Sequence, residues 1–139
     1  FRVARRAYPS QPFIADNEGD ISIACSHDGY MRLPGKVTHT RKWKLTDGDL
    51  FISDNLTGRY NHAEAHYHLH PDVMVEGVNN SSQVRLHLPS GTKYTIDAEG
   101  ADIKVLETTW HPEFGLSVAN KKLVLNFKQN EVNFVLKRA

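Results

Sequence analysis

The sequence has one cysteine, Cys25, among its 139 residues, so it can form no internal disulfide and no thiolate metal cluster. Cys25 ends the apolar segment 21–25, and we expect it to be a small buried hydrophobic side chain. The chain also lacks long hydrophobic runs, because its apolar stretches are far shorter than the roughly 20 residues that a bilayer-spanning helix needs. We therefore expect no membrane partner.

The sequence has no excess of charge of one sign. Its 17 Lys and Arg residues against 16 Asp and Glu residues leave a formal net charge of +1. A strongly basic balance is what attracts nucleic acid over a whole domain, so we expect no nucleic-acid partner. The charged fraction of 24% and the hydrophobic fraction of 40% are ordinary for a globular protein. The length suits a single domain over residues 1–139.

A helical pattern is also missing. No stretch offers three turns of helical periodicity, whereas alternation with period two recurs along the chain. Short alternating segments separated by turn residues are typical of sandwiches and barrels. We predict an all-β fold, a two-sheet antiparallel β-sandwich of roughly ten to twelve strands. The expected strands are Ile21–Cys25, Val37–Leu45, Leu50–Asp54, His62–His70, Val73–Val78, Gln83–Leu88, Lys93–Asp97, Ile103–Thr108, Lys122–Phe127 and Val132–Leu136.

Asp47-Gly48 is a strong signal for a tight hairpin turn. It predicts a register in which three pairs face each other: Leu45 with Leu50, Trp43 with Ile52, and Arg41 with Asp54. A guanidinium on an otherwise apolar face must be paired. We therefore predict an ion pair between Arg41 and Asp54, and the alternative is an arginine that binds the carboxylate of an acidic sugar.

A second turn lies around Gln129-Asn130, between the last two expected strands. A hairpin there would oppose apolar pairs on one face: Phe127 with Val132, Leu125 with Phe134, and Leu123 with Leu136. We predict that this hairpin is part of the core. Its other face is expected to be mostly solvent-facing and carries Lys122, Val124, Asn126, Asn133, Val135 and Lys137.

Histidine is concentrated between positions 62 and 70. Alternate side chains of a strand share a face, so His62, Glu64, His66, His68 and His70 are expected on one side. Two same-face imidazoles about 7 Å apart can converge on a metal ion. A zinc site needs at least three protein ligands, and no second cluster supplies the third, so we predict no metal. The alternatives are a strip that faces a sugar and a merely solvated face.

Several catalytic patterns are missing as well. The sequence has no Gly-rich phosphate loop, no Gly-x-Ser-x-Gly turn and no His-Glu-x-x-His helix. Its carboxylates are scattered, so none presents itself as half of a glycosidase pair. Trp110 could stack on a sugar ring or lie at the rim of the core. As candidate sugar-binding residues we take His66, His68, Arg41 and Trp110, with no catalytic residue and no cofactor.

Five short motifs follow one another along the chain. They are Ser-His-Asp-Gly-Tyr-Met-Arg-Leu at 26–33, Val-Thr-His-Thr-Arg at 37–41, Ile-Ser-Asp-Asn-Leu-Thr-Gly at 52–58, His-Tyr-His-Leu-His-Pro at 66–71 and Trp-His-Pro-Glu-Phe-Gly at 110–115. Their order resembles the C-terminal part of the heparinase II/III-like polysaccharide lyases. The resemblance covers residues 26–115, and beyond 115 it extends only to the strand pattern.

The resemblance implies an N-terminal α/α toroid followed by an antiparallel sheet domain. It also implies cleavage of acidic, uronate-containing glycans such as glycosaminoglycans by β-elimination. A base takes the proton at C5 and an acid, often Tyr, assists departure at C4. In the family these groups and the structural zinc ligands come from the toroid and from a His-x-His-x-Asp strand upstream of this sequence. The pair His66 and His68 falls on a later strand, so no catalytic residue is carried over.

We therefore expect the C-terminal β domain of such a lyase, excised from a longer protein and inactive alone. Its partners would be the toroid, on which it packs, and an acidic polysaccharide, for which it would form one wall of the cleft. A second copy could bind through an exposed edge. The resemblance favours a periplasmic or secreted location. The alternatives are a stand-alone carbohydrate-binding module, a purely structural sandwich, and a metal-dependent β-barrel enzyme.

Overall fold

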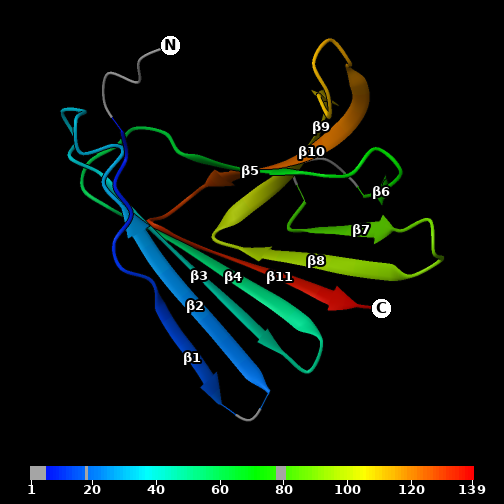
Figure 1. Ribbon diagram of the computed structural model, residues 1–139, viewed down its shortest axis with the longest axis horizontal. Coiled ribbons are helices and arrows are strands. Elements are labelled where there is room, and N and C mark those ends of the chain that lie inside the picture. The colour runs from blue at the N-terminus through cyan, green and yellow to red at the C-terminus, as the bar shows by residue number, and fades with distance from the viewer. Residues whose placement is uncertain (1–5, 18, 78–80) are drawn as a thin grey trace.

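The computed structural model describes residues 6–17, 19–77 and 81–139, and every regular element in these ranges is a β-strand. Eight strands form one antiparallel sheet in the order β1-β2-β3-β4-β11-β8-β7-β6, and three form a second in the order β5-β10-β9. The smaller sheet lies above part of the larger one (Figure 1). The predicted two-sheet antiparallel β-sandwich is confirmed.

The strands of the larger sheet are β1 (Phe13–Asn17), β2 (Asp20–His27), β3 (Thr38–Thr46), β4 (Asp49–Thr57), β6 (Met74–Glu76), β7 (Gln83–His87), β8 (Lys93–Glu99) and β11 (Glu131–Arg138). Those of the smaller sheet are β5 (Glu64–His68), β9 (Ala101–Trp110) and β10 (Val118–Phe127). Val78, the end of an expected strand, lies outside the described residues. No helix that could span a membrane occurs in the described ranges.

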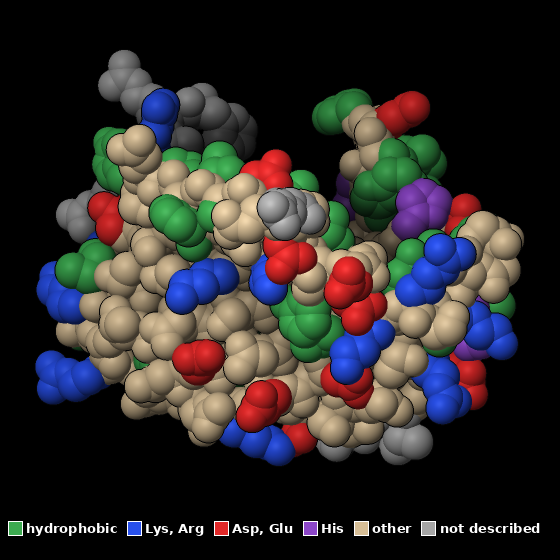
Figure 2. Space-filling model, turned by 90° about the horizontal axis from the view of Figure 1, so that it is seen from below, with side chains coloured by type: hydrophobic (Ala, Val, Ile, Leu, Met, Phe, Trp, Pro, Cys, Tyr) green, Lys and Arg blue, Asp and Glu red, His purple; other side chains and the backbone are tan. Residues whose placement is uncertain are grey.

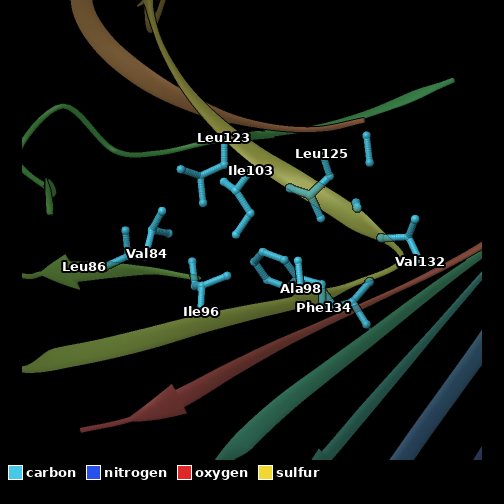
Figure 3. Close-up of a cluster of buried hydrophobic side chains, with 12 residues drawn as sticks. Val84, Leu86, Ile96, Ala98, Ile103, Leu123, Leu125, Val132 and Phe134 are labelled. Atoms are coloured by element: carbon cyan, nitrogen blue, oxygen red, sulfur yellow. The ribbon is translucent and has the colours of Figure 1, made fainter. Parts of the chain in front are cut away.

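The core lies between the two sheets. Figure 3 shows Ile103, Leu123 and Leu125 of the smaller sheet pointing toward Ile96 and Phe134 of the larger one. All five side chains are almost fully buried. Burial of each such side chain contributes roughly 1.5–3 kcal/mol, so this interlayer contact is the main stabilising element of the fold.

The turn at Asp47-Gly48 forms as predicted. Both residues have positive φ, 50° and 82°, which is the requirement of a type I′ hairpin turn. The strands β3 and β4 pair in the expected register, with Trp43 opposite Ile52 and Arg41 opposite Asp54. The turn therefore places the arginine and the aspartate on one face of the sheet.

The predicted hairpin of the last two strands is wrong. β10 pairs with β5 and β9, whereas β11 pairs with β4 and β8, so residues 128–130 carry the chain from one sheet to the other. Leu125 and Phe134 are both buried, but they meet across the interior and not along a ladder. Alternation reveals which residues are buried, but it is the same for a hairpin and for a crossover between facing sheets.

Val124 corrects a further detail of that prediction. It was expected on a mostly solvent-facing surface, but it is only 2% exposed. β10 is the central strand of the smaller sheet, and His66 and Lys104 stand opposite Val124 on the two neighbouring strands. A residue on a central strand has a neighbouring strand on each side, so Val124 is more buried than alternation suggests.

The chain also changes sheet at Gly100, the one residue between β8 and β9. Its φ of 79° lies in the left-handed region. A Cβ at this position would lie 2.4 Å from the backbone oxygen of Glu131. Only glycine fits such a corner without displacing the neighbouring backbone.

The larger sheet extends beyond the cover of the smaller one. One row of cross-strand neighbours runs along its inner face through Ile14, Ile23, Trp43, Ile52 and Phe134. The row is apolar throughout, but Phe134 is 5% exposed and Ile52 7%, while Ile23 is 37% and Ile14 67% exposed. The described chain therefore leaves the inner face of β1–β3 uncovered.

A second, parallel row repeats this gradient from the buried Ile96 to the exposed Leu45 and Ile21. Cys25 lies on the same inner face, opposite Arg41. It was expected to be buried, but it is only half-buried because no second layer covers β2 at this point. The side of the molecule below the larger sheet is different, with Lys, Arg, Asp and Glu side chains intermixed and no patch of one sign (Figure 2).

Candidate functional site

A buried carboxylate is the centre of the most polar part of the interior. Asp54 of β4 has a side chain that is 1% exposed. Its Oδ1 accepts hydrogen bonds from His39 Nε2 at 2.6 Å and Arg41 Nε at 2.7 Å. Its Oδ2 accepts from Arg41 Nη2 at 2.8 Å and from the hydroxyl of Tyr67 at 3.1 Å. Arg41 and Asp54 thus form a bidentate ion pair, which is the strongest geometry for these groups.

These contacts decide the protonation states of the cluster. Burial alone would raise the pKa of Asp54, but the hydrogen bonds and positive charge of His39 and Arg41 outweigh it and lower that pKa to about 2. Burial and the neighbouring carboxylate raise the pKa of Tyr67. At neutral pH the carboxylate is therefore charged and the phenol keeps its proton.

Tyr67 connects the two sheets at this point. It comes from β5 of the smaller sheet, and its ring stacks on Phe134 of the larger sheet at a centroid distance of 4.6 Å. The guanidinium carbon of Arg41 lies 5.2 Å from the Tyr67 ring centroid. The ring is thus held by stacking, by a cation–π contact and by the hydroxyl bond to Asp54.

A chain of hydrogen bonds leads from Asp54 toward the surface. His39 Nδ1 lies 3.1 Å from His27 Nε2, and the backbone N–H of Gly29 donates to His27 Nδ1 at 3.2 Å. His39 Nε2 faces a carboxylate and must carry a proton, so in neutral His39 the Nδ1 accepts and His27 Nε2 donates. Burial, and next a positive charge on His39, lower the pKa of His27, so His27 is held in its neutral form.

A pocket of about 370 Å³ opens beside this cluster. His39, Arg41 and Asp54 belong to its lining, and Asp54 is the most buried of the three. Its walls and mouth are lined by Tyr30, Leu33, Val37, Leu56, Tyr60, His62, Ala63, Glu64, Ala65, His66 and Phe127. The pocket therefore lies where β3 and β4 of the larger sheet meet β5 and the segment before it.

The structure brings together two of the four predicted sugar-binding residues. Arg41 and His66 both line the pocket, whereas His68 and Trp110 do not. Trp110 lies at the end of β9 with its ring centroid 5.3 Å from that of His70. Arg41 also donates to Asp54 through Nε and Nη2, and Nη2 lies 3.3 Å from the Tyr67 hydroxyl, so this side of its guanidinium is already used.

The histidine segment forms a short charged network at the pocket mouth. Glu64 accepts from His66 Nε2 at 2.9 Å and lies 3.1 Å from His62 Nε2. Ala65 and Tyr67 face the interior, as the alternation predicts. In the described ranges no group of three His, Cys, Asp or Glu side chains is placed to hold a metal ion. Imidazoles paired with one carboxylate are suited to hydrogen bonding with polar ligands.

His39 and Tyr67 are the cluster members that sequence reasoning did not select. Alternation places His39 on the same face as Arg41, and it places Tyr67 on the core side of its strand. A buried tyrosine hydroxyl needs a partner, which is a signal that a buried polar group lies opposite. The sequence does not show which strand of the other sheet faces β5, so it could not name Asp54 as that partner.

Comparison with known proteins gives a family and a fold. The family model described as "Heparinase II/III-like, C-terminal" matches residues 1–137. The heparan sulfate lyase HepC from Pedobacter heparinus has a similar structure, with a TM-score of 0.76 and 12% identity over 94% of this chain. The heparinase III BT4657 gene product gives a TM-score of 0.74 and 12% identity over 96% of this chain. No curated protein sequence gives a significant match.

Those two solved proteins are much longer than this chain. This chain corresponds to 21% of the HepC chain and to 21% of the BT4657 chain. At 12% identity the likeness shows the fold alone. The eight-stranded and three-stranded sheets described above are therefore an arrangement that also occurs as a small part of much larger polypeptides.

Proposed function

The chain belongs to the heparinase II/III-like C-terminal family, and from this membership we propose that it is the C-terminal β domain of a polysaccharide lyase. The whole lyase cleaves acidic, uronate-containing glycans by β-elimination. Its catalytic N-terminal α/α toroid packs on this domain, and the domain contributes one wall of the sugar cleft. The shared fold with two lyases of about five times its length supports a domain of this kind.

The uncovered inner face of β1–β3 is the observation that carries this proposal. Ile14, Ile21, Ile23 and Leu45 continue two apolar rows of the core, yet between 37% and 67% of each is exposed. Contiguous exposed apolar surface on a sheet marks a partner surface. A further part of a lyase that packs here would complete the second layer of the sandwich.

The polar cluster supports a structural and binding role for this domain. β-Elimination needs a base that is unprotonated at working pH and an acid within reach of the leaving group. Tyr67 is poorly suited to be the base, because its hydroxyl donates to Asp54 and its pKa is raised. Asp54 is poorly suited to be the acid, because its pKa is about 2. Neither residue of this buried pair is suited to proton transfer, and we infer that the base and the acid come from the toroid, as the family resemblance implies.

The test uses the whole gene product that contains this chain. Ultraviolet absorbance of the unsaturated uronate follows its activity on heparan sulfate, alginate and chondroitin. Ile23→Glu places a charge on the uncovered face and should reduce the rate at least about tenfold, since the toroid would detach. Lys42→Glu, on the opposite face of the neighbouring strand, is the matched control and should retain the rate. Full activity of Ile23→Glu, or a gene product without a toroid, would contradict the proposal.

A further inference from the structure

The pocket beside Asp54 combines apolar side chains with a few polar and charged groups. We propose that it binds one uncharged sugar unit of the glycan, a hexose or an N-acetylhexosamine, and that it disfavours a uronate. This proposal rests on the proposed function, because it takes the ligand to be part of the polysaccharide on which the lyase acts. It deepens that function, because it states which of the two sugar units that alternate in many acidic glycans the pocket selects.

The size of the pocket suits a single ring. Its volume of about 370 Å³ lies near the lower end of the roughly 300–1,000 Å³ that is typical of small-molecule sites. Apolar side chains such as Leu56 and Phe127 form part of the wall, and they can pack against the C–H groups of a sugar. A ligand pocket with an apolar wall and a few convergent polar groups is the common pattern of such sites.

The charged groups of the described lining favour an uncharged ligand over an anion. Among the lining residues that the structure describes, Arg41 is the one Lys or Arg, and its charge is balanced by its bidentate pair with Asp54. Glu64 adds a second negative group at the mouth. Lys122 Nζ lies 3.4 Å from His66 Nδ1, but Lys122 is not a lining residue. Arg41, Asp54 and Glu64 give the described lining one guanidinium and two carboxylates, and this excess of carboxylates repels a uronate.

The free edge of β5 supplies hydrogen-bonding groups for hydroxyls. The backbone N–H of Phe127 donates to Ala63 O, and that of Leu69 donates to Lys121 O, so odd-numbered residues of this segment bond toward β10. The N–H and C=O groups of Glu64 and His66 therefore point away from β10. β5 is an edge strand within the described residues, and side chains from both of its faces line the pocket. The pocket thus adjoins unpaired donors and acceptors.

Two tyrosines stand at the mouth. The hydroxyl of Tyr60 donates to Asn130 Oδ1 at 2.8 Å, which fixes its ring against the pocket wall. Tyr30 is 47% exposed, with its ring centroid 5.3 Å from that of His27. Tyrosine rings combine an apolar face with a polar tip, so they suit a ligand that presents both C–H groups and hydroxyls.

The test is an NMR titration of the isotope-labelled 139-residue chain with glucose, N-acetylglucosamine and glucuronate. Glucose and glucuronate differ only at C6, so their comparison isolates the charge. We expect saturable shifts at Glu64, Ala65 and His66 with the two uncharged sugars, and at least about tenfold weaker binding of glucuronate. His68→Ala, on the same strand but outside the pocket, should leave these shifts unchanged.

Glu64→Gln gives the sharpest comparison, because it removes charge but keeps shape. It should strengthen glucuronate binding relative to glucose, and Tyr60→Ala should weaken both. Equal or tighter binding of glucuronate by the unaltered chain would overturn the proposal, and so would the absence of binding by any of the three sugars. Either result leaves the lyase-domain proposal standing, because the activity of the whole gene product tests that separately.

Discussion

At the scale of the residue, the ion pair of Arg41 and Asp54 was predictable because a local turn fixes it. The type I′ turn at Asp47-Gly48 sets the β3–β4 register, and the register sets the pair. His39 shares that face, so its approach to Asp54 follows from the same register. Tyr67 comes from the other sheet, and no local rule predicts which strand faces which. The contact between Tyr67 and Asp54, which joins the two sheets, could therefore not be predicted from the sequence.

We expect Arg41→Leu to destabilise the fold by about 3–5 kcal/mol, because it leaves a charged carboxylate buried without its main partner. The free energy of unfolding in urea measures this cost. Lys44→Leu is the matched control, since it breaks the pair with Asp20, where both side chains are at least 40% exposed. That change should cost about 1 kcal/mol or less. Equal costs for the two variants would contradict the assigned burial of the Arg41 pair.

The pH dependence of stability should show two steps. The folded pKa of Asp54 is about 2, below the unfolded value of about 3.9, so its stabilisation is present above pH 3.9 and fades as the pH falls toward 2. The pKa of His27 is also lowered, first by burial and then by the charge of His39, which together outweigh the opposite effect of Asp28. The unfolded chain therefore binds this proton first, and stability begins to fall below about pH 6.5. Urea unfolding between pH 2 and 8 measures both steps, and His27→Gln should remove the upper one.

At the scale of the element, strand positions followed from alternation and turn residues, whereas the connections between sheets did not. The pattern of Lys122–Phe127 and Val132–Leu136 is the same whether the two strands pair or face each other across the core. What distinguishes a hairpin from a crossover is how closely the backbones of distant segments approach, as Gly100 and the backbone oxygen of Glu131 do here. Such an approach is visible only in the folded structure, because the two residues are far apart in the sequence.

Substitution of Gly48 and Gly100, which have similar backbone conformations, can separate the cost of backbone strain from the cost of a steric clash. Gly48 has a φ of 82° with open space around its Cα, and Gly100 has a φ of 79° with the Glu131 oxygen in the way. Gly48→Ala should cost roughly 1–2 kcal/mol from left-handed backbone strain alone. Gly100→Ala should cost clearly more, because the corner between β8 and β9 must shift. Equal changes in the free energy of unfolding would show that this corner relaxes freely.

At the scale of the whole molecule, family and fold were both correctly predicted, because five ordered motifs and a strand pattern carry them. The sheet face that needs a partner could not be predicted in the same way. It depends on where the smaller sheet stops, and this becomes visible only when both layers are seen together (Figure 1). Cys25 of β2 is likewise less buried than its apolar segment suggests.

The isolated 139-residue chain should release no unsaturated uronate from heparin, heparan sulfate, alginate or chondroitin. Asp54 and Tyr67 are held in protonation states unsuited to proton transfer, and the resemblance places the family's base and acid upstream of this sequence. Absorbance of the unsaturated product over several hours measures this directly, with the whole gene product as the positive control. Sustained product formation by the pure chain would show that a base and an acid lie within these residues.

The uncovered face also predicts how the isolated chain behaves in solution. Ile14, Ile23 and Leu45 expose a continuation of the core, and burial of apolar surface yields roughly 25 cal/mol per Å², so two copies gain by covering each other's rows. Sedimentation velocity should show concentration-dependent association. Ile23→Glu should return the chain to a monomer without a loss of folded structure, because residue 23 lies outside the buried cluster. Lys42→Glu, on the opposite face, should leave association unchanged. A monomer at every concentration would mean that the apolar rows need no partner, and it would remove the main support for a docked toroid.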